Sequence, residues 1–206
     1  MMKLYSAPGT CALASHIALE EAGADYEVEF LDFSSKAQTS AEYLSINPKG
    51  RVPALVTAKG MISETPAILT YLAQAFPDAR LAPSDDIFAM ARMNAFNSYL
   101  CSTVHVSHAH KSRGHRWADE QTSFDDMRRK IPETATANFS LIENELLQGP
   151  WVMGDDYTVA DGYLFTVTGW LKGDGVDPEQ FPAVAEHTKR MRDRPAVANV
   201  LSMLPR

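Results

Sequence analysis

The sequence predicts a small α/β domain followed by a larger all-helical domain. Strand-like and helix-like segments alternate up to residue 76, whereas strand patterns are nearly absent beyond residue 86. Residues 77–84, between these two parts, are rich in Pro, Asp and Ala, which is typical of a linker. We therefore expect one domain at residues 1–78 and a second at residues 86–206.

In the first domain, the pattern indicates a βαβ unit followed by a ββα unit. The apolar run at residues 3–6 suits a strand, and residues 12–22 carry apolar side chains at helical spacing. Residues 26–31 alternate apolar and acidic side chains, as expected for a second strand parallel to the first. Two further strands are predicted at residues 52–57 and 59–63 and a helix at 66–76, whereas residues 33–45 are predicted to be irregular.

The second domain is predicted to consist of helices separated by glycine-rich turns. Gly149-Pro150 and the stretch Gly173-Asp174-Gly175 are the clearest interruptions. The expected helices span residues 87–111, 124–147, 159–172, 181–192 and 196–203. Thr158 and Asp161 have the spacing of a capping box at the start of the third of these helices, a feature that serves folding.

Composition and charge narrow the class of protein. The 206 residues are 45% hydrophobic and 22% charged, as is ordinary for a soluble globular protein. The formal net charge of −7 argues against nucleic acid or an anionic membrane as a partner. Two cysteines, Cys11 and Cys101, make no disulfide framework. With no signal-peptide pattern and no apolar run of spanning length, we expect a cytoplasmic protein.

Cys11 is the first candidate functional residue, because it falls where a predicted strand turns into a predicted helix. Free backbone N–H groups and the helix dipole stabilise a thiolate at such a position. We therefore expect the pKa of this thiol to be lowered. Cys101, on a later helix, is expected to be an ordinary buried cysteine.

The stretch Asn47-Pro48-Lys49-Gly50-Arg51-Val52-Pro53 is the second candidate site. Pro53 would open a strand, where the N–H that proline lacks costs least. If the Val52–Pro53 bond is cis, the main-chain groups of Val52 face outward and can pair with an extended peptide. An ordinary trans turn is the alternative that the residues leave open.

The stretch Glu64-Thr65-Pro66 predicts a helix start, with Thr65 as N-cap and Pro66 as the first helical residue. The free N–H groups of such a start favour a carboxylate. Glu64 would instead suit an ammonium group, so a ligand with both groups would satisfy the pair. A cap without a ligand is the alternative.

These motifs together resemble a known family. Cysteine at position 11, where relatives have tyrosine or serine, is similar to the bacterial beta class of glutathione transferases. Residues 154–165 resemble the C-terminal signature of that family, and the resemblance spans essentially the whole chain. The N-terminal motifs that carry it are Ser6-x-Pro8-Gly9-x-Cys11, Asn47-Pro48-Lys49-Gly50-x-Val52-Pro53 and Glu64-Thr65-x-Ala67-Ile68.

The resemblance implies a thioredoxin-like domain that binds glutathione and a helical domain that shapes the second-substrate pocket and the homodimer. It implies a cis Val52–Pro53 bond and places Cys11 and His105 as catalytic residues beside the glutathione sulfur, with His105 able to lower a thiol pKa and move a proton. Glutathione is the expected co-substrate, with no other cofactor. Its implied binding residues are Cys11, Lys36, Val52, Pro53, Glu64, Thr65, Ser98, Ser102, Thr103 and His105.

The chain departs from the beta-class pattern around His105. Val106 stands where lysine is frequent, Thr103 where a carboxylate is frequent, and Ser98 where asparagine is frequent. In the resembled class these positions contribute contacts to glutathione across the dimer, so the three departures are expected to weaken those contacts and to slow conjugation.

Four histidines, at positions 105, 108, 110 and 115, accompany a basic segment at residues 111–117. No carboxylate or cysteine ligand pattern goes with them, so no metal site is expected. The basic segment suits either the solvated end of a helix or a contact to an anionic second substrate. Phe165 and Trp170 are interpreted as core residues.

The function that these patterns predict is attack of the glutathione thiolate on a small hydrophobic electrophile. Cys11 leaves a second enzymatic interpretation open, because a cysteine beside a bound thiol can form a mixed disulfide. That interpretation is a glutathione-dependent thiol–disulfide oxidoreductase or peroxidase. A non-catalytic ligand-binding protein is the third, favoured by the departures around His105.

Overall fold

A computed structural model describes residues 1–205. Its first part contains a four-stranded sheet in the order β2-β1-β3-β4. Strand β1 pairs in parallel with β2 and antiparallel with β3, which in turn pairs antiparallel with β4. This mixed sheet confirms the expected thioredoxin-like domain. The strands are β1 (Met2–Ser6), β2 (Tyr26–Phe30), β3 (Ala54–Thr57) and β4 (Gly60–Ser63).

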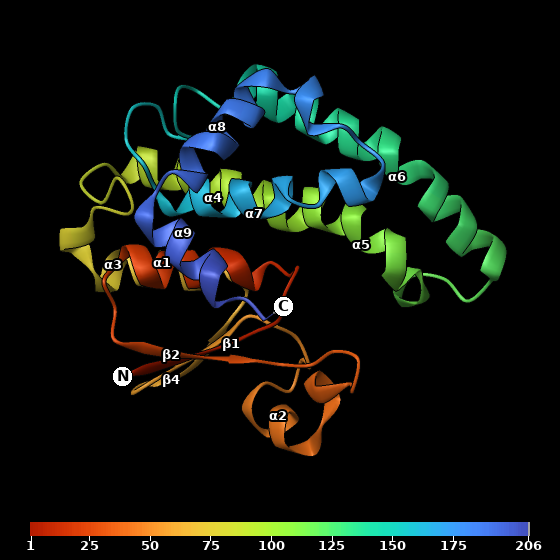
Figure 1. The fold of residues 1–206 in the computed structure, drawn as a ribbon, viewed down its shortest axis with the longest axis horizontal. Coiled ribbons are helices and arrows are strands. Elements are labelled where there is room, and N and C mark those ends of the chain that lie inside the picture. The colour runs from red at the N-terminus through yellow and green to blue at the C-terminus, as the bar shows by residue number, and fades with distance from the viewer. Residues whose placement is uncertain (206) are drawn as a thin grey trace.

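Helices α1 (Ala12–Glu21) and α3 (Thr65–Ala75) separate this sheet from the helical part of the molecule (Figure 1). The opposite face carries the short helix α2 (Ala41–Ile46), in a region that we predicted to be irregular. That prediction was wrong for residues 41–45. The hydroxyl of Ser40 accepts a hydrogen bond from the Tyr43 N–H, which caps α2, and the buried ring of Tyr43 packs 5.4 Å from that of Tyr5.

The second part is all-helical, as expected. The predicted helix at residues 87–111 is interrupted by a π-helical turn at Leu100–Val104, which separates α4 from α5 just before His105. Such turns widen a helix locally and are frequent at functional sites. A second π turn, Ile142–Leu146, follows α6. The helices are α4 (Ile87–Tyr99), α5 (His105–Arg113), α6 (Gln121–Leu141), α7 (Val159–Thr168), α8 (Pro182–Arg192) and α9 (Pro195–Met203).

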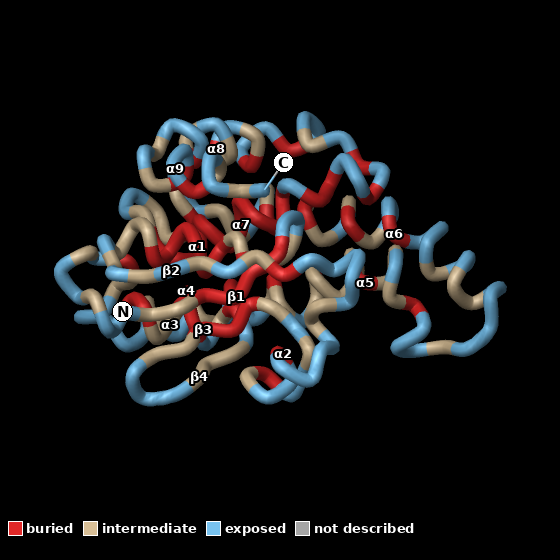
Figure 2. The backbone as a smooth tube through the Cα atoms, turned by 60° about the horizontal axis from the view of Figure 1, so that its bottom comes forward, coloured by how far each residue is buried: buried red, intermediate tan, exposed pale blue. Residues whose placement is uncertain are grey.

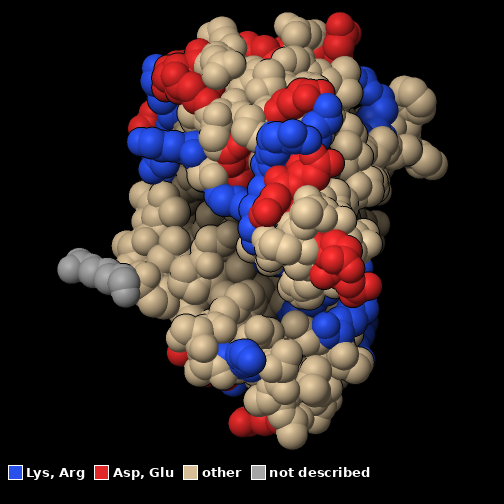
Figure 3. Space-filling model, turned by 90° about the vertical axis from the view of Figure 1, so that its right-hand side faces the viewer, with Lys and Arg blue, Asp and Glu red and all other residues tan. Residues whose placement is uncertain are grey.

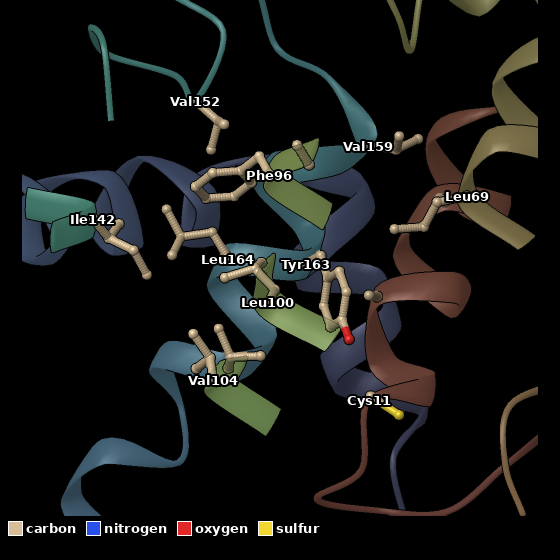
Figure 4. Close-up of a cluster of buried hydrophobic side chains, with 14 of the residues drawn as sticks. Cys11, Leu69, Phe96, Leu100, Val104, Ile142, Val152, Val159, Tyr163 and Leu164 are labelled. Carbon is tan, nitrogen blue, oxygen red and sulfur yellow. The ribbon is translucent and has the colours of Figure 1, made fainter. Parts of the chain in front are cut away.

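The two parts share one hydrophobic core. Buried residues run from the sheet through α1 and α3 into α4 and α7 (Figure 2). Tyr163 of α7 is fully buried at the centre of this core, and Figure 4 shows its side chain directed from α7 toward the end of α1 that carries Cys11. Because the core is continuous, the position of Cys11 is fixed by both parts of the molecule.

The capping box predicted at the start of α7 is confirmed. The carboxylate of Asp161 accepts the Thr158 N–H at 2.7 Å and is itself fully buried. It also accepts hydrogen bonds from the Val152 N–H at 2.7 Å and from Nε2 of His187 at 3.0 Å. Asp161 therefore connects α7 to α8 and to the preceding loop, beyond the capping role that the sequence indicated.

Candidate functional site

A cavity of about 760 Å³ lies between the sheet-containing part and α5. Its walls come from the loop before α1, the loop before β3, the start of α3, and α5 with the turn that follows it. Six predicted site residues are brought together there, from positions up to 94 residues apart in the sequence: Cys11, Val52, Pro53, Glu64, Thr65 and His105.

Cys11 occupies the N-cap position of α1, as the sequence predicted. Gly9, with a φ of 71°, allows the chain to turn just before it. The thiol is buried, and its sulfur lies 3.8 Å from the carbonyl oxygen of Val52, to which it can donate. The Val52–Pro53 bond is cis, as the resemblance implied.

The expectation of a lowered thiol pKa was wrong. Burial raises the pKa of Cys11, and the lowering contributions of the Thr65 side chain and of the Arg113 charge do not compensate. The desolvation cost of a buried thiolate here exceeds the stabilisation that the N-terminus of α1 provides. The Cys11 thiol is therefore protonated at neutral pH and can donate a hydrogen bond.

Helix α3 begins one residue earlier than predicted, because Glu64 is its N-cap and Thr65 its first residue. Glu64 has a φ of 73°, which is uncommon for a residue other than glycine and is frequent at ligand sites. Its carboxylate pairs with Nζ of Lys49 at 2.6 Å. Lys49 was not predicted as a site residue, although it lies within the Asn47-Pro48-Lys49-Gly50 motif.

His105, the first residue of α5, lines the cavity next to the ring of Trp170, with 5.0 Å between ring centroids. Burial, together with the nearby charge of Arg113, lowers the pKa of His105 to about 4. The guanidinium of Arg113 lies 3.5 Å from Nε2. The imidazole is therefore neutral at physiological pH, so it can hydrogen-bond a sulfur atom but brings no positive charge to a thiolate.

A pair that sequence reasoning missed, the half-buried His108 and the buried Asp174, joins the cavity to the helical core. His108 lines the cavity, and its Nδ1 lies 2.7 Å from the buried carboxylate of Asp174. Its ring stacks on Trp170 at 4.4 Å, and the indole N–H of Trp170 donates to the Gly9 carbonyl at 3.1 Å. We interpreted Trp170 as core; it is buried and also lines the cavity. No local pattern links His108 to Asp174, because 66 residues separate them.

Four predicted glutathione-binding residues do not line this cavity. Lys36 is exposed in a left-handed turn, and Ser102 is exposed on the π turn, where its hydroxyl donates to the Ser98 carbonyl. Thr103 accepts at its carbonyl from the Ser107 hydroxyl. Ser98 lies in a separate shallow groove between α3 and α4. Whether these residues contact glutathione stays a prediction.

Neither a metal-binding cluster nor a membrane-spanning helix is found in the described part of the chain. Among residues 1–205, no group of three or more His, Cys, Asp or Glu side chains is arranged to hold a metal ion. Within the same residues, no helix combines the length and the apolar character needed to cross a bilayer.

The fold and the cavity define a thioredoxin-like domain joined to a helical domain, with a thiol at their junction. Two family models match the chain: Glutathione S-transferase, N-terminal domain, at residues 1–74, and Glutathione S-transferase, C-terminal domain, at residues 112–195. The chain belongs to the glutathione S-transferase family.

Individual relatives agree with this assignment along the whole chain. Glutathione S-transferase GstA of Escherichia coli O157:H7 is 31% identical over 204 residues, which is 98% of each chain. The structure of a glutathione transferase homologue from Sulfitobacter with bound glutathione is 46% identical, with a TM-score of 0.95 over 98% of this chain and 97% of that one. The bacterial beta class enzyme of Sphingomonas chungbukensis is 32% identical, with a TM-score of 0.85 over 97% of both chains.

Proposed function

We propose that this protein conjugates glutathione to a small electrophile and belongs to the beta class. The observation that carries the proposal is the meeting of Cys11, Val52, Glu64 and His105 in one cavity of this family's fold. In the reaction, the glutathione sulfur forms a bond to an electrophilic carbon, and the leaving group departs with its electron pair. The thiol proton passes to solvent.

Glutathione, as an extended tripeptide, fits across this cavity. We place its cysteinyl main chain against Val52 and its γ-glutamyl end at Glu64 and Thr65, where the first N–H groups of α3 favour a carboxylate. The ligand ammonium competes with Lys49 for Glu64. Lys36, from the loop before α2, is the proposed partner of the glycine carboxylate.

The protonation states suggest how the thiolate is stabilised. Since burial raises the pKa of Cys11, its S–H group is available to donate to the glutathione sulfur. Neutral His105 can act as a second hydrogen-bonding group on the other side of the cavity. In this proposal Cys11 and His105 lower the pKa of the glutathione thiol as donors, and neither becomes charged.

We propose that the protein is a cytoplasmic homodimer with domain bounds at residues 78 and 86. The apolar groove between α3 and α4, lined by Pro66, Tyr71 and Ser98 among others, supports a contact between two copies. Ser98 lies in this groove, and its carbonyl accepts a hydrogen bond from the Ser102 hydroxyl. We propose that Ser98, Ser102 and Thr103 serve the partner's glutathione site. Light scattering of the purified protein tests the dimer.

The second candidate is thiol–disulfide exchange, favoured by the free Cys11 within the cavity. In that reaction the Cys11 sulfur forms a disulfide with the glutathionyl sulfur of a mixed disulfide, and the other thiol leaves. A second glutathione then restores Cys11 and departs as glutathione disulfide. Because the pKa of Cys11 is raised, we expect this reaction to be slow at neutral pH.

Three measurements distinguish these functions: conjugation of a chlorodinitrobenzene, reduction of a glutathione mixed disulfide, and calorimetric binding of glutathione. We expect conjugation in the wild type. Binding without turnover would indicate a ligand-binding protein.

Two substitutions test the role of Cys11. Cys11→Ala should lower kcat/KM for conjugation about tenfold, whereas Cys11→Ser keeps a donor and should lose less. If Cys11→Ala leaves conjugation unchanged, the assignment of Cys11 is wrong. If disulfide reduction is the main activity of the wild type and both variants abolish it, thiol–disulfide exchange is the function.

A further inference from the structure

Three arginines converge on the same cavity. Arg51 precedes Val52, Arg113 ends α5, and Arg116 belongs to the 3-10 turn that follows. Their proximity is visible in their mutual effects: burial and the charges of Arg51 and Arg113 lower the pKa of Arg116. All three charges also lower the pKa of His105, so each arginine lies near this imidazole.

None of these three guanidinium groups forms an ion pair within residues 1–205. Glu64 is the carboxylate that lines the cavity, and it is paired with Lys49. Arg194 shows the contrasting arrangement, since it makes two hydrogen bonds to Glu21, at 2.5 and 2.8 Å. Arg113 is half-buried, whereas Arg51 and Arg116 are exposed at the cavity. In a chain of net charge −7, three arginines without ion pairs that line one cavity favour an anion there.

Apolar side chains lie in the same cavity beside this charge. Phe33, Leu44 and Trp117 line it and are 36%, 38% and 48% exposed. Figure 3, which looks at this side of the molecule, shows a hollow between the helical part above and the sheet-containing part below, with Lys and Arg side chains beside it. The cavity therefore suits an occupant with an apolar body and an anionic end.

Glutathione alone does not account for all three arginines. Its γ-glutamyl carboxylate is placed at the start of α3, and its glycine carboxylate can neutralise one further group. Resting on the conjugation proposed above, we propose that the second substrate is an electrophile that carries a carboxylate, and that Arg113 and Arg116 bind this carboxylate with Arg51 facing them. This narrows the substrate from a hydrophobic electrophile to an amphiphilic anion.

The carboxylate is a handle and takes no part in the bond changes. The glutathione sulfur attacks the electrophilic carbon, the carbon–leaving-group bond breaks with its electrons on the leaving group, and the carboxylate stays ionised throughout. Holding it fixes the electrophilic carbon relative to the sulfur, which is the advantage of a charged anchor over an apolar pocket alone.

A pair of probes that differ only in charge tests this proposal: a chlorodinitrobenzoate and its methyl ester. Enzymatic rates are divided by the uncatalysed rates, because the ester is the more reactive compound. We expect the wild type to favour the benzoate in kcat/KM. Arg116→Gln and Arg113→Gln should each reduce the benzoate-to-ester preference about tenfold, as expected for loss of a charge-assisted bond.

Arg129→Gln is the matched control, since this residue lies on α6 with its side chain 83% exposed and outside the cavity. It should leave the preference unchanged. If the cavity arginine variants instead raise the KM for glutathione and keep the preference, the arginines serve glutathione and the proposal is overturned.

A binding measurement separates this proposal from the conjugation on which it rests. Dinitrobenzoate, which has no leaving group, is titrated into glutathione-saturated protein by calorimetry. Binding that weakens about tenfold in Arg116→Gln supports the anion site even if no conjugation is detected. Equal binding of dinitrobenzoate and its methyl ester would overturn it.

Discussion

Burial determines the charge state of several residues in this protein, and it acts against what their sequence positions suggest. Cys11 has a helix N-terminus behind it, yet burial raises the pKa of its thiol. His105 has a thiol in the same cavity, yet burial lowers the pKa of the imidazole to about 4. Both residues line the same cavity, as the resemblance implied, but desolvation depends on side chains from distant segments, which no local pattern reveals.

His16 offers a test of the same effect away from the cavity. It is fully buried in α1, its ring lies edge-on to Tyr26 at 5.5 Å, and neither ring nitrogen has a hydrogen-bond partner among residues 1–205. Burial lowers the pKa of His16 to about 4 from an ordinary 6.5. Between these values the unfolded chain binds a proton that the folded protein does not, so stability rises with pH.

We predict that the free energy of unfolding falls by about 2 kcal/mol between pH 7 and pH 5 through His16 alone. Urea unfolding of dilute protein at both values measures this change. His16→Met should remove the contribution of His16 to this pH dependence. The contribution of His105, which also lowers stability as the pH falls, should remain. The prediction would be contradicted if His16→Met lost as much stability between pH 7 and pH 5 as the wild type does.

At the scale of elements, the sequence predicted best where a local signal suffices. An apolar run located β1, alternation located β2, and the Thr158–Asp161 spacing located the start of α7. The short helix α2 was missed because one buried residue, Tyr43, and one cap, Ser40, hold it. The boundary between α4 and α5 was missed because a π turn keeps the helical periodicity nearly intact.

The network around Asp161 should exceed an ordinary cap in its contribution to stability. We predict that Thr158→Ala costs about 1 kcal/mol. Asp161→Ala should cost about 3 kcal/mol or more, because it leaves the Val152 and Thr158 N–H groups and His187 without their buried acceptor. Chemical denaturation measures both, with the exposed neighbour Asp156→Ala as control. Equal costs for Thr158→Ala and Asp161→Ala would show that the additional bonds contribute nothing.

At the scale of the whole molecule, the sheet-containing part and the helical part differ in sequence pattern but pack into one hydrophobic core. Leu4 and Leu55 of the sheet belong to the same buried cluster as Leu100 and Tyr163. The sequence could predict the order of the two parts and six of the residues that line the cavity, because most of the motifs that carry them are local. The basic segment at residues 111–117 was already one candidate contact for an anionic second substrate. The sequence could not predict that Arg51 lines the same cavity as Arg113 and Arg116, or that His108 pairs with Asp174, because these residues meet only when the chain folds.

This shared core predicts that both parts unfold in one transition. All three tryptophans, at positions 117, 151 and 170, belong to the helical part, whereas Cys11 belongs to the first. Tryptophan fluorescence and the reactivity of Cys11 toward a thiol reagent should therefore give the same urea midpoint. Exposure of Cys11 at a clearly lower urea concentration would mean that the sheet-containing part unfolds separately. Cys101→Ser restricts the thiol signal to Cys11.

The position of Trp170 should make its fluorescence sensitive to ligand binding in the cavity. The indole stacks on His108, lies against His105, and is hydrogen-bonded to the loop that carries Cys11. A ligand that enters beside these groups alters the polarity and quenching around a single chromophore. Trp117 lines the cavity near Arg113 and Arg116 and should respond to the electrophile. The emission spectrum of Trp117→Phe would therefore report binding of glutathione, and that of Trp170→Phe would report binding of the electrophile.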